Sequence, residues 1–446
     1  MSTVIKGVPA PGYNPVSASD YIPLEKMREI QLERFIKVVK NAYENVPLYR
    51  QRLDEANFDV NSFKSLDDVK RLPFTKKVDL RDTYPYGLFA RPLKDIVRLH
   101  ASSGTTGKPI VVAYTKEDLA VWQQTMCRSL AGVGMSSEDV VQNSYGYGLF
   151  TGGLGAHYGA EGLGATVIPT SGGNTARQIM LMRDFGVTAI TCTPSYFIHL
   201  IDEAGKMGID LRTLPIRRGV FGAEPWTEGM RRYIEEAAGI KAYDIYGLSE
   251  ITGPGVGCEC EYQNGLHIFE DHYYPEIIDP ETLEVLPDGE EGELVLTTLS
   301  KDAMPMIRYR TRDITSIVTE KCPCGRTIRR IARIGRRSDD MFIIRGVNVF
   351  PSQIETAILN AEKCLPNYQI VLTRTKGLDN MEVQIELTPE MFSDKVSAME
   401  ELTIKFSKAI EKIINIRTAV RLMPPNSIPR SEGKAKRVVD KRELGK

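Results

Sequence analysis

Residues 102–109 read Ser-Ser-Gly-Thr-Thr-Gly-Lys-Pro and lie between two β-like runs, Ile96–His100 and Ile110–Tyr114. Small residues let successive backbone N–H groups curl around an anion, and hydroxyls and a lysine add donors and a positive charge. The stretch is not a Walker loop, because only two residues separate its glycines and the proline prevents a helix from starting there. By itself it fits an anion-binding loop and a polar hairpin turn equally well.

The residues around this stretch alternate between β-rich and helical segments, from about Val97 to Thr298. Such alternation favours an α/β architecture with stacked or wound sheets. Strands are predicted at Ile110–Tyr114, Ala165–Pro169, Ala189–Thr193, Gly219–Phe221, Lys241–Tyr246 and Glu293–Thr297, and helices at Glu117–Val133, Ala176–Phe185, Ser195–Met207 and Thr227–Ala238. The glycine-rich stretch from Gly146 to Gly173 is expected to form mostly loops.

The two ends of the chain have different patterns. Residues Leu24–Ala56 predict two helices, because apolar residues recur at helical spacing and Pro47 ends the first near Glu44. After Asp340, the order β-α-β-β-α-β predicts a compact α+β domain, with strands at Met341–Arg345, Tyr368–Thr373, Met381–Leu387 and Ala419–Met423 and helices at Pro351–Ala361 and Asp394–Ile414. We therefore predict a large N-terminal body, residues 1–338, and a smaller C-terminal domain, residues 339–446.

The composition excludes several classes of function. The 446 residues include 57 Lys and Arg and 58 Asp and Glu, a net charge of −1, so no basic footprint indicates nucleic-acid binding. The first residues contain no apolar core of a signal peptide, and no run of about 18 apolar residues predicts a membrane span. We expect a cytoplasmic, multi-domain protein with neither a nucleic-acid nor a membrane partner.

The seven cysteines include two close pairs, Cys258-Glu-Cys260 and Cys322-Pro-Cys324. With His267 they resemble a tetrahedral structural zinc site, although pairs separated by two residues are more usual. The alternative is a set of free thiols in loops. Cys127, Cys192 and Cys364 stand in apolar runs and are expected to pack in the core. His100 is expected at the surface, and His157, His199 and His272 are expected to lack a nearby nucleophile, so no triad is predicted.

Four further motifs follow residues 102–109 in order: Gly222-Ala223-Glu224, Tyr243-Asp-Ile-Tyr-Gly-Leu-Ser-Glu250, Tyr309-Arg-Thr-Arg-Asp313 and Pro429-Arg-Ser-Glu-Gly-Lys434. Together they resemble the adenylate-forming superfamily of acyl-CoA synthetases, luciferases and peptide-synthetase adenylation domains. The stretches 272–275, 343–354 and 427–434 resemble its phenylacetate–CoA ligase branch. The resemblance implies an α/β fold with a large multi-sheet N-terminal body and a smaller α+β C-terminal domain that rotates.

The resemblance also implies a two-step reaction. A carboxylate attacks the α-phosphorus of ATP, giving an acyl-adenylate and pyrophosphate, and the thiol of coenzyme A then displaces AMP. The implied substrate is phenylacetate or a closely related aryl acid, with Mg²⁺ as a cofactor and a homodimer as the usual assembly. Two alternatives stay open: an adenylating enzyme acting on another acceptor, such as a deazaflavin cofactor, and a zinc-stabilised nucleotide-binding protein without ligase activity.

The family's nucleotide-binding residues carry over to positions of this chain. The phosphates would contact Ser102, Ser103, Gly104, Thr105, Thr106, Gly107 and Lys108; the adenosine would contact Gly222, Ala223, Glu224, Asp244, Ile245, Tyr246, Gly247, Asp313 and Arg337. Asp313 would accept hydrogen bonds from the ribose; its alternative is an ion pair with Arg310 or Arg312.

Two residues carry the implied catalysis. Glu250 would bind Mg²⁺, unless it is only a carboxylate at the start of a helix that Ser249 caps. Lys434 would bridge the substrate carboxylate and the α-phosphate, unless it belongs to a solvated basic tail. Asp339 would be the hinge of the rotation, with Arg336 where relatives have glycine, and Arg345-Gly346 would then face the active site.

The remaining implied residues form the acyl pocket and the metal site. Tyr145, Tyr147, Phe150, Ala223, Ile245, Gly253 and Pro254 would surround a flat ring, although each could equally be core. The metal ligands would be Cys260, His267, Cys322 and Cys324, because Cys260 aligns better than Cys258 with the relatives that have such a set.

Overall fold

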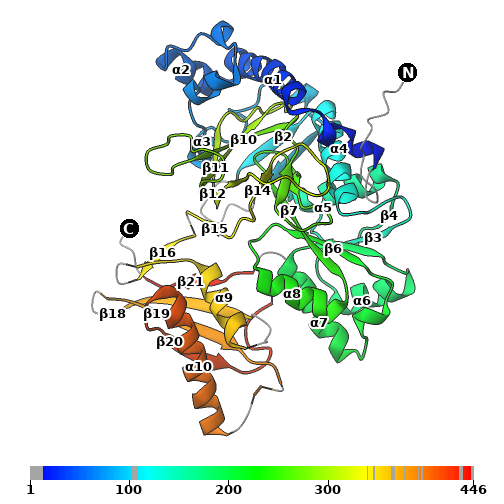
Figure 1. The fold of residues 1–446 in the computed structure, drawn as a ribbon, viewed down its shortest axis with the longest axis vertical. Coiled ribbons are helices and arrows are strands. Elements are labelled where there is room, and N and C mark those ends of the chain that lie inside the picture. The colour runs from blue at the N-terminus through cyan, green and yellow to red at the C-terminus, as the bar shows by residue number, and fades with distance from the viewer. Residues whose placement is uncertain are drawn as a thin grey trace. The chain divides into compact units, whose positions relative to one another are not determined.

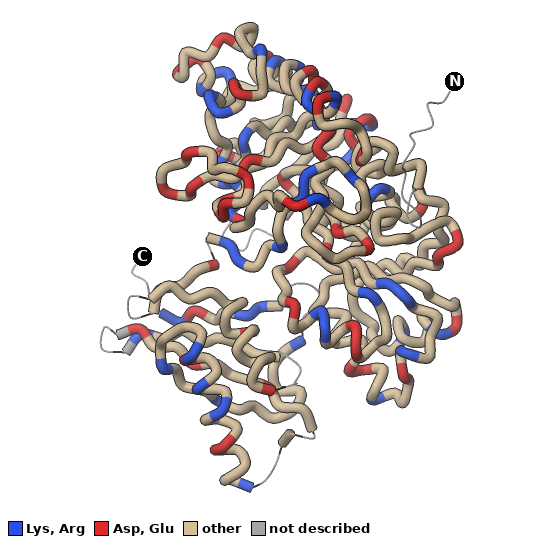
Figure 2. Tube along the Cα trace, viewed as in Figure 1, with Lys and Arg blue, Asp and Glu red and all other residues tan. Residues whose placement is uncertain are grey.

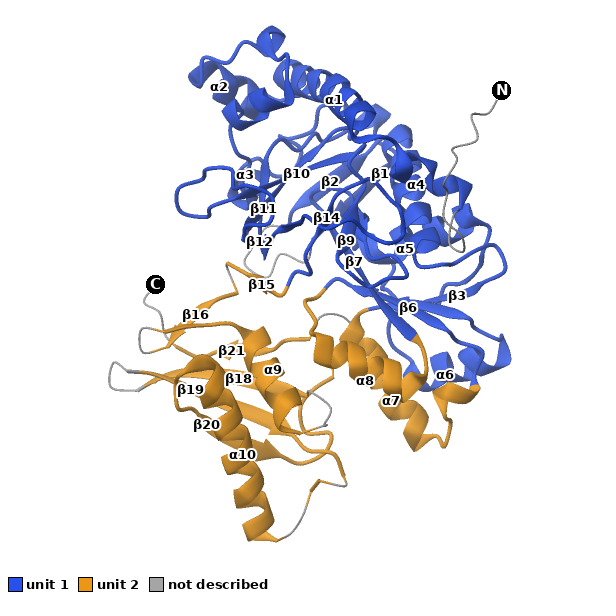
Figure 3. Ribbon diagram, in the orientation of Figure 1, with its two compact units in different colours: residues 1–192, 214–223, 241–334 blue, residues 193–213, 224–240, 335–446 orange. Residues whose placement is uncertain are grey.

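The computed structural model describes residues 14–102, 109–338, 340–344, 347–362, 367–375, 378–389, 391–392, 395–430 and 435–442. The chain forms two compact units (Figure 3). Unit 1 contains Met1–Cys192, Leu214–Ala223 and Lys241–Ile334, and unit 2 contains Thr193–Thr213, Glu224–Ile240 and Gly335–Lys446. The mixed α/β class with several sheets is as predicted. The division of the sequence after residue 338 stays a prediction.

Unit 1 combines helices with most of the strands (Figure 1). Its helices are α1 (Leu24–Asn45), α2 (Pro47–Glu55), α3 (Lys77–Asp82), α4 (Lys116–Gly132), α5 (Thr151–Leu163) and α6 (Thr175–Asp184), with short 3₁₀ turns at Pro15–Tyr21, Val60–Ser62, Leu66–Arg71 and Leu93–Asp95. Its strands are β1 (Arg98–Ala101), β2 (Val111–Tyr114), β3 (Val140–Asn143), β4 (Thr166–Ile168), β5 (Ala189–Cys192), β6 (Arg218–Gly222), β7 (Lys241–Leu248), β8 (Gly253–Cys258), β9 (Leu266–Ile268), β10 (Tyr273–Ile278), β11 (Gly292–Thr298), β12 (Tyr309–Thr315), β13 (Ile317–Val318) and β14 (Arg330–Ile331).

A nine-stranded sheet forms the centre of unit 1, in the order β13-β14-β9-β8-β7-β6-β5-β3-β4. The five strands from β7 to β4 are parallel, and β8, β9, β14 and β13 continue the sheet in antiparallel pairs. Strand β5 is completely buried, as expected of a parallel strand covered on both faces. Ligands of such sheets bind beyond the carboxyl ends of the strands. We therefore expect the loops after β3, β6 and β7 to form the binding site.

Helix α5 corrects the expectation that the glycine-rich stretch forms mostly loops. Five of its glycines lie inside this helix, TGGLGAHYGAEGL. A Cβ added to Gly159 would lie 2.4 Å from the Cβ of Met126, and one added to Gly162 would lie 2.7 Å from the Sγ of Cys127. The glycines therefore let α5 pack closely on α4, which outweighs their low helix propensity.

The N-terminal helices agree with the predicted pattern, whereas β10 and β12 of the smaller sheets were not predicted. Helix α1 ends at Asn45 and α2 begins at Pro47, where proline is tolerated because the first helical N–H has no partner within the helix. Strands β10, β11 and β12 form an antiparallel sheet, and β1 pairs with β2 in antiparallel fashion, with residues 102–109 between them in the sequence. Acidic and basic residues are interspersed along α1 (Figure 2).

Among the described helices, none is both long and apolar enough to cross a membrane.

Unit 2 contains two helices from the middle of the chain and the C-terminal domain. Its elements are α7 (Pro194–Lys206), a 3₁₀ turn at Leu211–Thr213, α8 (Glu228–Ala238), β15 (Arg336–Arg337), β16 (Phe342–Ile344), β17 (Val347–Val349), α9 (Pro351–Ala361), β18 (Tyr368–Thr375), β19 (Leu378–Glu386), α10 (Val396–Ile414), β20 (Ala419–Met423) and β21 (Val438–Asp440). Helices α9 and α10 pack against each other, and their apolar residues join those of the sheet in one core.

The strand order of the C-terminal domain differs from the simplest reading of the pattern. The sheet has the order β20-β19-β18-β21, whereas the strand predicted at Met341–Arg345 pairs with β17 in a separate hairpin. The fourth position is taken by β21, parallel to β18, which sequence analysis missed. Its three residues, Val438–Asp440, stand among basic residues that read as a solvated tail. Backbone pairing with β18 therefore decided the structure of a segment that is too short for periodicity to reveal.

Candidate functional site

The carboxyl edge of the parallel strands in unit 1 carries two of the predicted adenosine motifs. Gly222 ends β6, and a Cβ there would lie 2.3 Å from the carbonyl oxygen of Ile245 on β7, so only glycine permits this approach. The next residue, Ala223, has φ +71° and is exposed, a backbone conformation that costs energy for a residue other than glycine. The loop therefore has a constrained backbone at the edge where ligands of such sheets bind.

Tyr246 and Asp313 join two of the sheets of unit 1. The Tyr246 hydroxyl donates a hydrogen bond of 2.6 Å to Oδ2 of Asp313 on β12. The arginines considered as alternative partners both turn to Glu293: Arg310 Nη2 lies 2.6 Å and Arg312 Nη1 3.5 Å from its Oε2. Asp313 is buried and has its carboxylate beside the aromatic ring predicted to stack on adenine.

Asp244 has a different surrounding from the one its predicted adenine-edge role suggests. Arg333 Nε donates a hydrogen bond of 3.1 Å to its Oδ2, and its backbone N–H donates to Glu259 Oε2 at 2.8 Å. These two contacts fix the position of Asp244 on β7, the strand that also carries Tyr246.

Glu250 lies in the turn that joins β7 to β8, so the chain continues into a strand and Ser249 caps no helix there. The carboxylate is buried and its Oε1 lies 3.9 Å from the Nζ of Lys77. The turn itself is held by two donors: Lys301 Nζ donates to the Glu250 carbonyl oxygen at 3.2 Å, and the Tyr114 hydroxyl donates to that of Thr252 at 2.7 Å.

Lys77 and Lys301 are contacts of the site that sequence analysis missed. Burial lowers the pKa of Lys301 to about 8, and its ammonium lies 4.9 Å from the centre of the Tyr114 ring. Neither lysine belongs to a local motif, and both reach Glu250 from segments that are distant in sequence. Only the three-dimensional packing reveals them.

The residues predicted to surround the acyl group come from three neighbouring segments. Tyr145 is buried, Phe150 is 46% exposed, and the Tyr147 hydroxyl accepts a hydrogen bond of 2.7 Å from Asn143 Nδ2 and lies 3.1 Å from Nδ1 of His157. A Cβ on Gly253 would lie 2.5 Å from the Trp122 ring. Trp122 Nε1 in turn donates to the Pro254 carbonyl at 2.9 Å. Ile245, which is predicted to line the acyl pocket as well as the adenosine site, is buried on β7.

The four predicted metal ligands are brought together in unit 1. One ligand atom from each of Cys260, His267, Cys322 and Cys324 lies within 4.8 Å of every other, and all four residues are buried. The Sγ atoms of Cys260 and Cys322 are 3.6 Å apart, and Cys324 Sγ is 3.4 Å from His267 Nε2. Three sulfurs and one imidazole nitrogen at these distances are a donor set that zinc prefers.

Two further observations concern the cysteines of this region. The hydrogen bonds among the cluster thiols lower the pKa of Cys324 and raise that of Cys260, so they favour a thiolate at Cys324 and a thiol at Cys260. Cys258 instead belongs to the main apolar core, and burial raises the pKa of its thiol. The geometry thus groups Cys260, rather than Cys258, with the second cysteine pair.

Two expectations about histidines are wrong. His100 is buried rather than exposed, and its ring makes edge contacts with the stacked rings of Tyr114 and Trp122. His272 does have a hydroxyl nearby, with Nδ1 2.6 Å from Ser300 Oγ. Burial lowers the pKa of His272 to about 4, which makes it a poor base at neutral pH.

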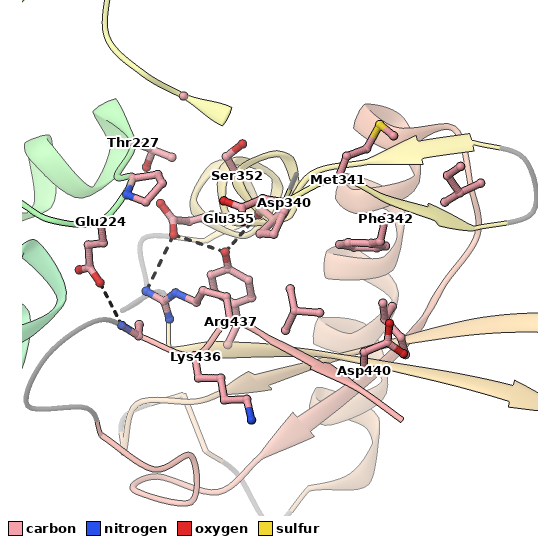
Figure 4. Close-up of a pocket in the computed structure, with 18 of the residues that line it drawn as sticks. Glu224, Thr227, Asp340, Met341, Phe342, Ser352, Glu355, Lys436, Arg437 and Asp440 are labelled. Carbon is pink, nitrogen blue, oxygen red and sulfur yellow. Dashed lines mark hydrogen bonds and ion pairs between the residues drawn. The ribbon is translucent and has the colours of Figure 1, made fainter. Parts of the chain in front are cut away.

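Unit 2 contains a cavity of about 1040 Å³ beside the segment that precedes β21 (Figure 4). Glu224 lines it, and its two oxygens accept separate backbone hydrogen bonds: Oε1 from Ser195 N at 2.8 Å and Oε2 from Ala435 N at 3.0 Å. Arg337 Nε lies 3.9 Å from Asp340 Oδ2. Other predicted site residues lie outside the described ranges, namely Ser103, Gly104, Thr105, Thr106, Gly107, Lys108, Asp339, Arg345, Gly346 and Lys434.

Comparison with known proteins places these features in one family. Residues 47–300 match the family of the AMP-binding enzyme, and residues 346–442 match the AMP-binding enzyme C-terminal domain. The chain is also 53% identical over 420 residues to the phenylacetate–coenzyme A ligase of Pseudomonas putida, which covers 94% of this chain and 95% of that protein. The chain belongs to the AMP-binding enzymes, among the phenylacetate–CoA ligases.

Solved structures of a related AMP-binding enzyme show the same fold. 2-Hydroxyisobutyryl-CoA ligase in its postadenylation state, in complex with R3-HIB-AMP, has a TM-score of 0.90 and 30% identity, covering 97% of this chain and 94% of that one. The same ligase in complex with 2-HIB-AMP and CoA, in its thioesterification state, has a TM-score of 0.71 and 32% identity, covering 95% and 92%.

Proposed function

We propose that this AMP-binding enzyme ligates phenylacetate, or a closely related aryl acid, to coenzyme A through an acyl-adenylate, releasing AMP and pyrophosphate. The observation that carries the proposal is the near full-length identity of 53% to a phenylacetate–coenzyme A ligase. The arrangement of Tyr246, Asp313 and Glu250 within unit 1 supports it, because adenylate formation depends mainly on positioning and charge neutralisation.

In the first half-reaction the chain binds ATP and holds the acid in line with the α-phosphorus. Residues 102–108 contact the phosphates, and Asp313, oriented by the Tyr246 hydroxyl, accepts hydrogen bonds from the ribose. Glu250 would hold Mg²⁺, and the ion would neutralise phosphate charge. A buried carboxylate on a turn that Lys301 and Tyr114 hold suits this ligand role. Lys434 places its ammonium between the carboxylate and the α-phosphate.

In the second half-reaction the C-terminal domain turns about Asp339, which exchanges the Lys434 segment for a face that admits CoA. Two observations support this proposal: the same relative is known in a postadenylation and in a thioesterification state, and the tail of this chain has its own core. A hinge needs only a residue that can absorb a change of backbone angles, so arginine at 336 is compatible with it.

The aryl pocket and the metal have separate roles. Tyr145, Tyr147, Phe150, Gly253 and Pro254 provide an aromatic and glycine-lined space for a flat ring, in which one ring substituent changes affinity only modestly. Zinc bound by Cys260, His267, Cys322 and Cys324 stabilises the body and takes no part in the reaction. The homodimer and the cytoplasmic location stay predictions.

A pyrophosphate-release assay tests the function. The full-length protein is incubated with ATP and Mg²⁺ and a panel of aryl acids, with and without CoA. We expect pyrophosphate with phenylacetate in either case, and AMP with phenylacetyl-CoA only when CoA is present. Pyrophosphate with an acid but no thioester would favour an adenylating enzyme for another acceptor, and no pyrophosphate with any acid would favour a nucleotide-binding protein without ligase activity.

A further inference from the structure

The segment that bears Lys434 is flanked by two anchored residues in unit 2. On its N-terminal side, Arg430 Nη2 lies 2.5 Å from Glu386 Oε1 of β19 and 3.9 Å from Asp202 Oδ2 of α7. On its C-terminal side, the backbone N–H of Ala435 donates to Glu224 Oε2 at 3.0 Å. Glu224 thus contacts the residue immediately after Lys434.

The residues beyond Ala435 are held by their own domain instead. Ile370 N donates to the Arg437 carbonyl at 2.8 Å, and Val438 begins the pairing of β21 with β18. The Arg437 guanidinium lies 4.6 Å from the centre of the Tyr368 ring and 3.9 Å from Glu355 Oε2 (Figure 4). Glu224 therefore contacts Ala435, which precedes the residues of β21 that pair with β18.

The carboxylate of Glu224 is fixed in turn. Its other oxygen accepts from Ser195 N at 2.8 Å, in the first turn of α7, where backbone N–H groups lack partners and favour a negative charge. One side chain thus joins a helix start to the lysine segment through two hydrogen bonds, one per oxygen. A charge-assisted bond of this kind is stronger than a neutral one and depends on direction.

We propose that Glu224 is a positioning residue for adenylate formation, since its side chain holds the Ala435 N–H and so places Lys434 for the first half-reaction. This inference rests on the proposed function. It gives Glu224 a role distinct from the adenine contact expected from its motif, because that contact involves the backbone. The second half-reaction requires the segment to leave, so the side chain is not needed there.

The test replaces Glu224 with glutamine in the full-length enzyme, because the amide keeps the size but has only one accepting oxygen. Adenylation is measured as pyrophosphate release with ATP and phenylacetate without CoA. Thioesterification is measured separately from phenylacetyl-adenylate and CoA. For E224Q we expect kcat of adenylation to fall roughly 10- to 100-fold with KM for ATP little changed, and thioesterification to stay within about twofold.

The matched control is Glu228→Gln. It makes the same change on an exposed glutamate four residues later in the sequence, at the start of α8. Hydrogen-exchange mass spectrometry of a peptide that begins at or before residue 430 and contains Ala435 gives a second readout, because exchange at the Ala435 N–H should be faster in E224Q than in wild type or E228Q.

The outcomes separate the two proposals. Equal losses in both half-reactions, a rise confined to KM for ATP, or unchanged exchange would overturn the positioning role while leaving the ligase intact. A wild-type enzyme that forms no pyrophosphate with any aryl acid would overturn the proposed function and the positioning role with it.

Discussion

The cysteine cluster of unit 1 and the two residues that flank the lysine segment of unit 2, Arg430 and Ala435, differ in the kind of contact that holds them. The cluster consists of four buried side chains whose ligand atoms lie within 4.8 Å of one another. The lysine segment is anchored on its flanks, by the Arg430 ion pairs and by one hydrogen bond from Ala435 to Glu224. A structural metal requires a site that never opens, whereas a catalytic group used in only one half-reaction requires contacts that can be broken.

The surroundings of the cluster reinforce this difference. Arg326, two residues after Cys324, has Nε 3.0 Å from Asp20 Oδ2, and Arg128 binds the other oxygen of Asp20 at 2.6 Å. These side chains are almost completely buried, so removing any one leaves an uncompensated charge. The turn that contains Cys322 and Cys324 is thereby tied to the N-terminal segment, and disturbance of the cluster should spread through unit 1.

The largest expected effect comes from removing the Lys434 side chain, which we propose acts in only one half-reaction. Lys434→Ala should lower the rate of adenylation by about 10³-fold, because no other charge replaces the ammonium at the α-phosphate. Thioesterification from preformed phenylacetyl-adenylate should be nearly unchanged. The two half-reactions are measured separately, with Lys436→Ala as the control on the same segment. Equal losses in both would show that the lysine segment is structural rather than exchangeable.

The second effect tests whether the cysteine cluster binds zinc. Enzyme purified without added zinc should contain about one equivalent of zinc by emission spectroscopy, and Cys324→Ser should lose it and about 3 kcal/mol of unfolding free energy, since structural metal binding contributes to folding. Cys258→Ala is the matched control, because Cys258 lies in the apolar core and should leave the metal in place. Less than a tenth of an equivalent in the wild type would end the zinc assignment.

The sequence predicts these two regions unequally, for a physical reason. The motifs at Glu250, Asp313 and Lys434 are local, so a resemblance can locate them, and the cysteine pairs are close in sequence. Their long-range partners are not local: Lys301 approaches the Glu250 turn across 51 residues, and Ala435 contacts Glu224 across 211. No periodicity or spacing encodes such contacts.

The fold shows the same limit. Long amphipathic helices and apolar strands were predictable, and α9 and β20 have the predicted bounds. Helix α5 was not, because its glycines are selected by close packing on α4 rather than by helix propensity. Strand β21 was not, because three residues take their structure from the neighbouring β18.

A third, smaller effect concerns the stability of unit 1 at acidic pH. The folded protein keeps His272 neutral, with its pKa lowered from 6.5 to about 4 by burial. The unfolded chain takes up a proton below about pH 6.5, so stability falls as the pH decreases from that value towards 4. Between pH 7 and 5 this residue should cost about 2 kcal/mol, at about 1.4 kcal/mol per pKa unit.

This pH dependence is measured by denaturant unfolding at both pH values. Trp226→Phe leaves Trp122 as the only tryptophan, and Trp122 is buried in unit 1, so its fluorescence reports that unit. His272→Asn in this background should reduce the slope, and the part that remains should come from groups such as His100, whose pKa burial also lowers. A slope that persists unreduced in the asparagine variant would assign the acid sensitivity to other groups.

The smallest expected effect separates a fixed contact of the nucleotide site from the exchangeable lysine. Tyr246→Phe removes the hydroxyl that donates to Asp313 at 2.6 Å, and KM for ATP should rise about fivefold with kcat little changed, which corresponds to about 1 kcal/mol for one hydrogen bond. Both residues lie in unit 1, and the AMP group stays bound through both steps. KM for phenylacetyl-adenylate in thioesterification should therefore rise by a similar factor, unlike the one-sided effect of Lys434→Ala. If Tyr246→Phe affected adenylation alone, the Tyr246–Asp313 pair would act in only one half-reaction, as we propose for Lys434. The pair would then not be a contact that unit 1 keeps through both steps.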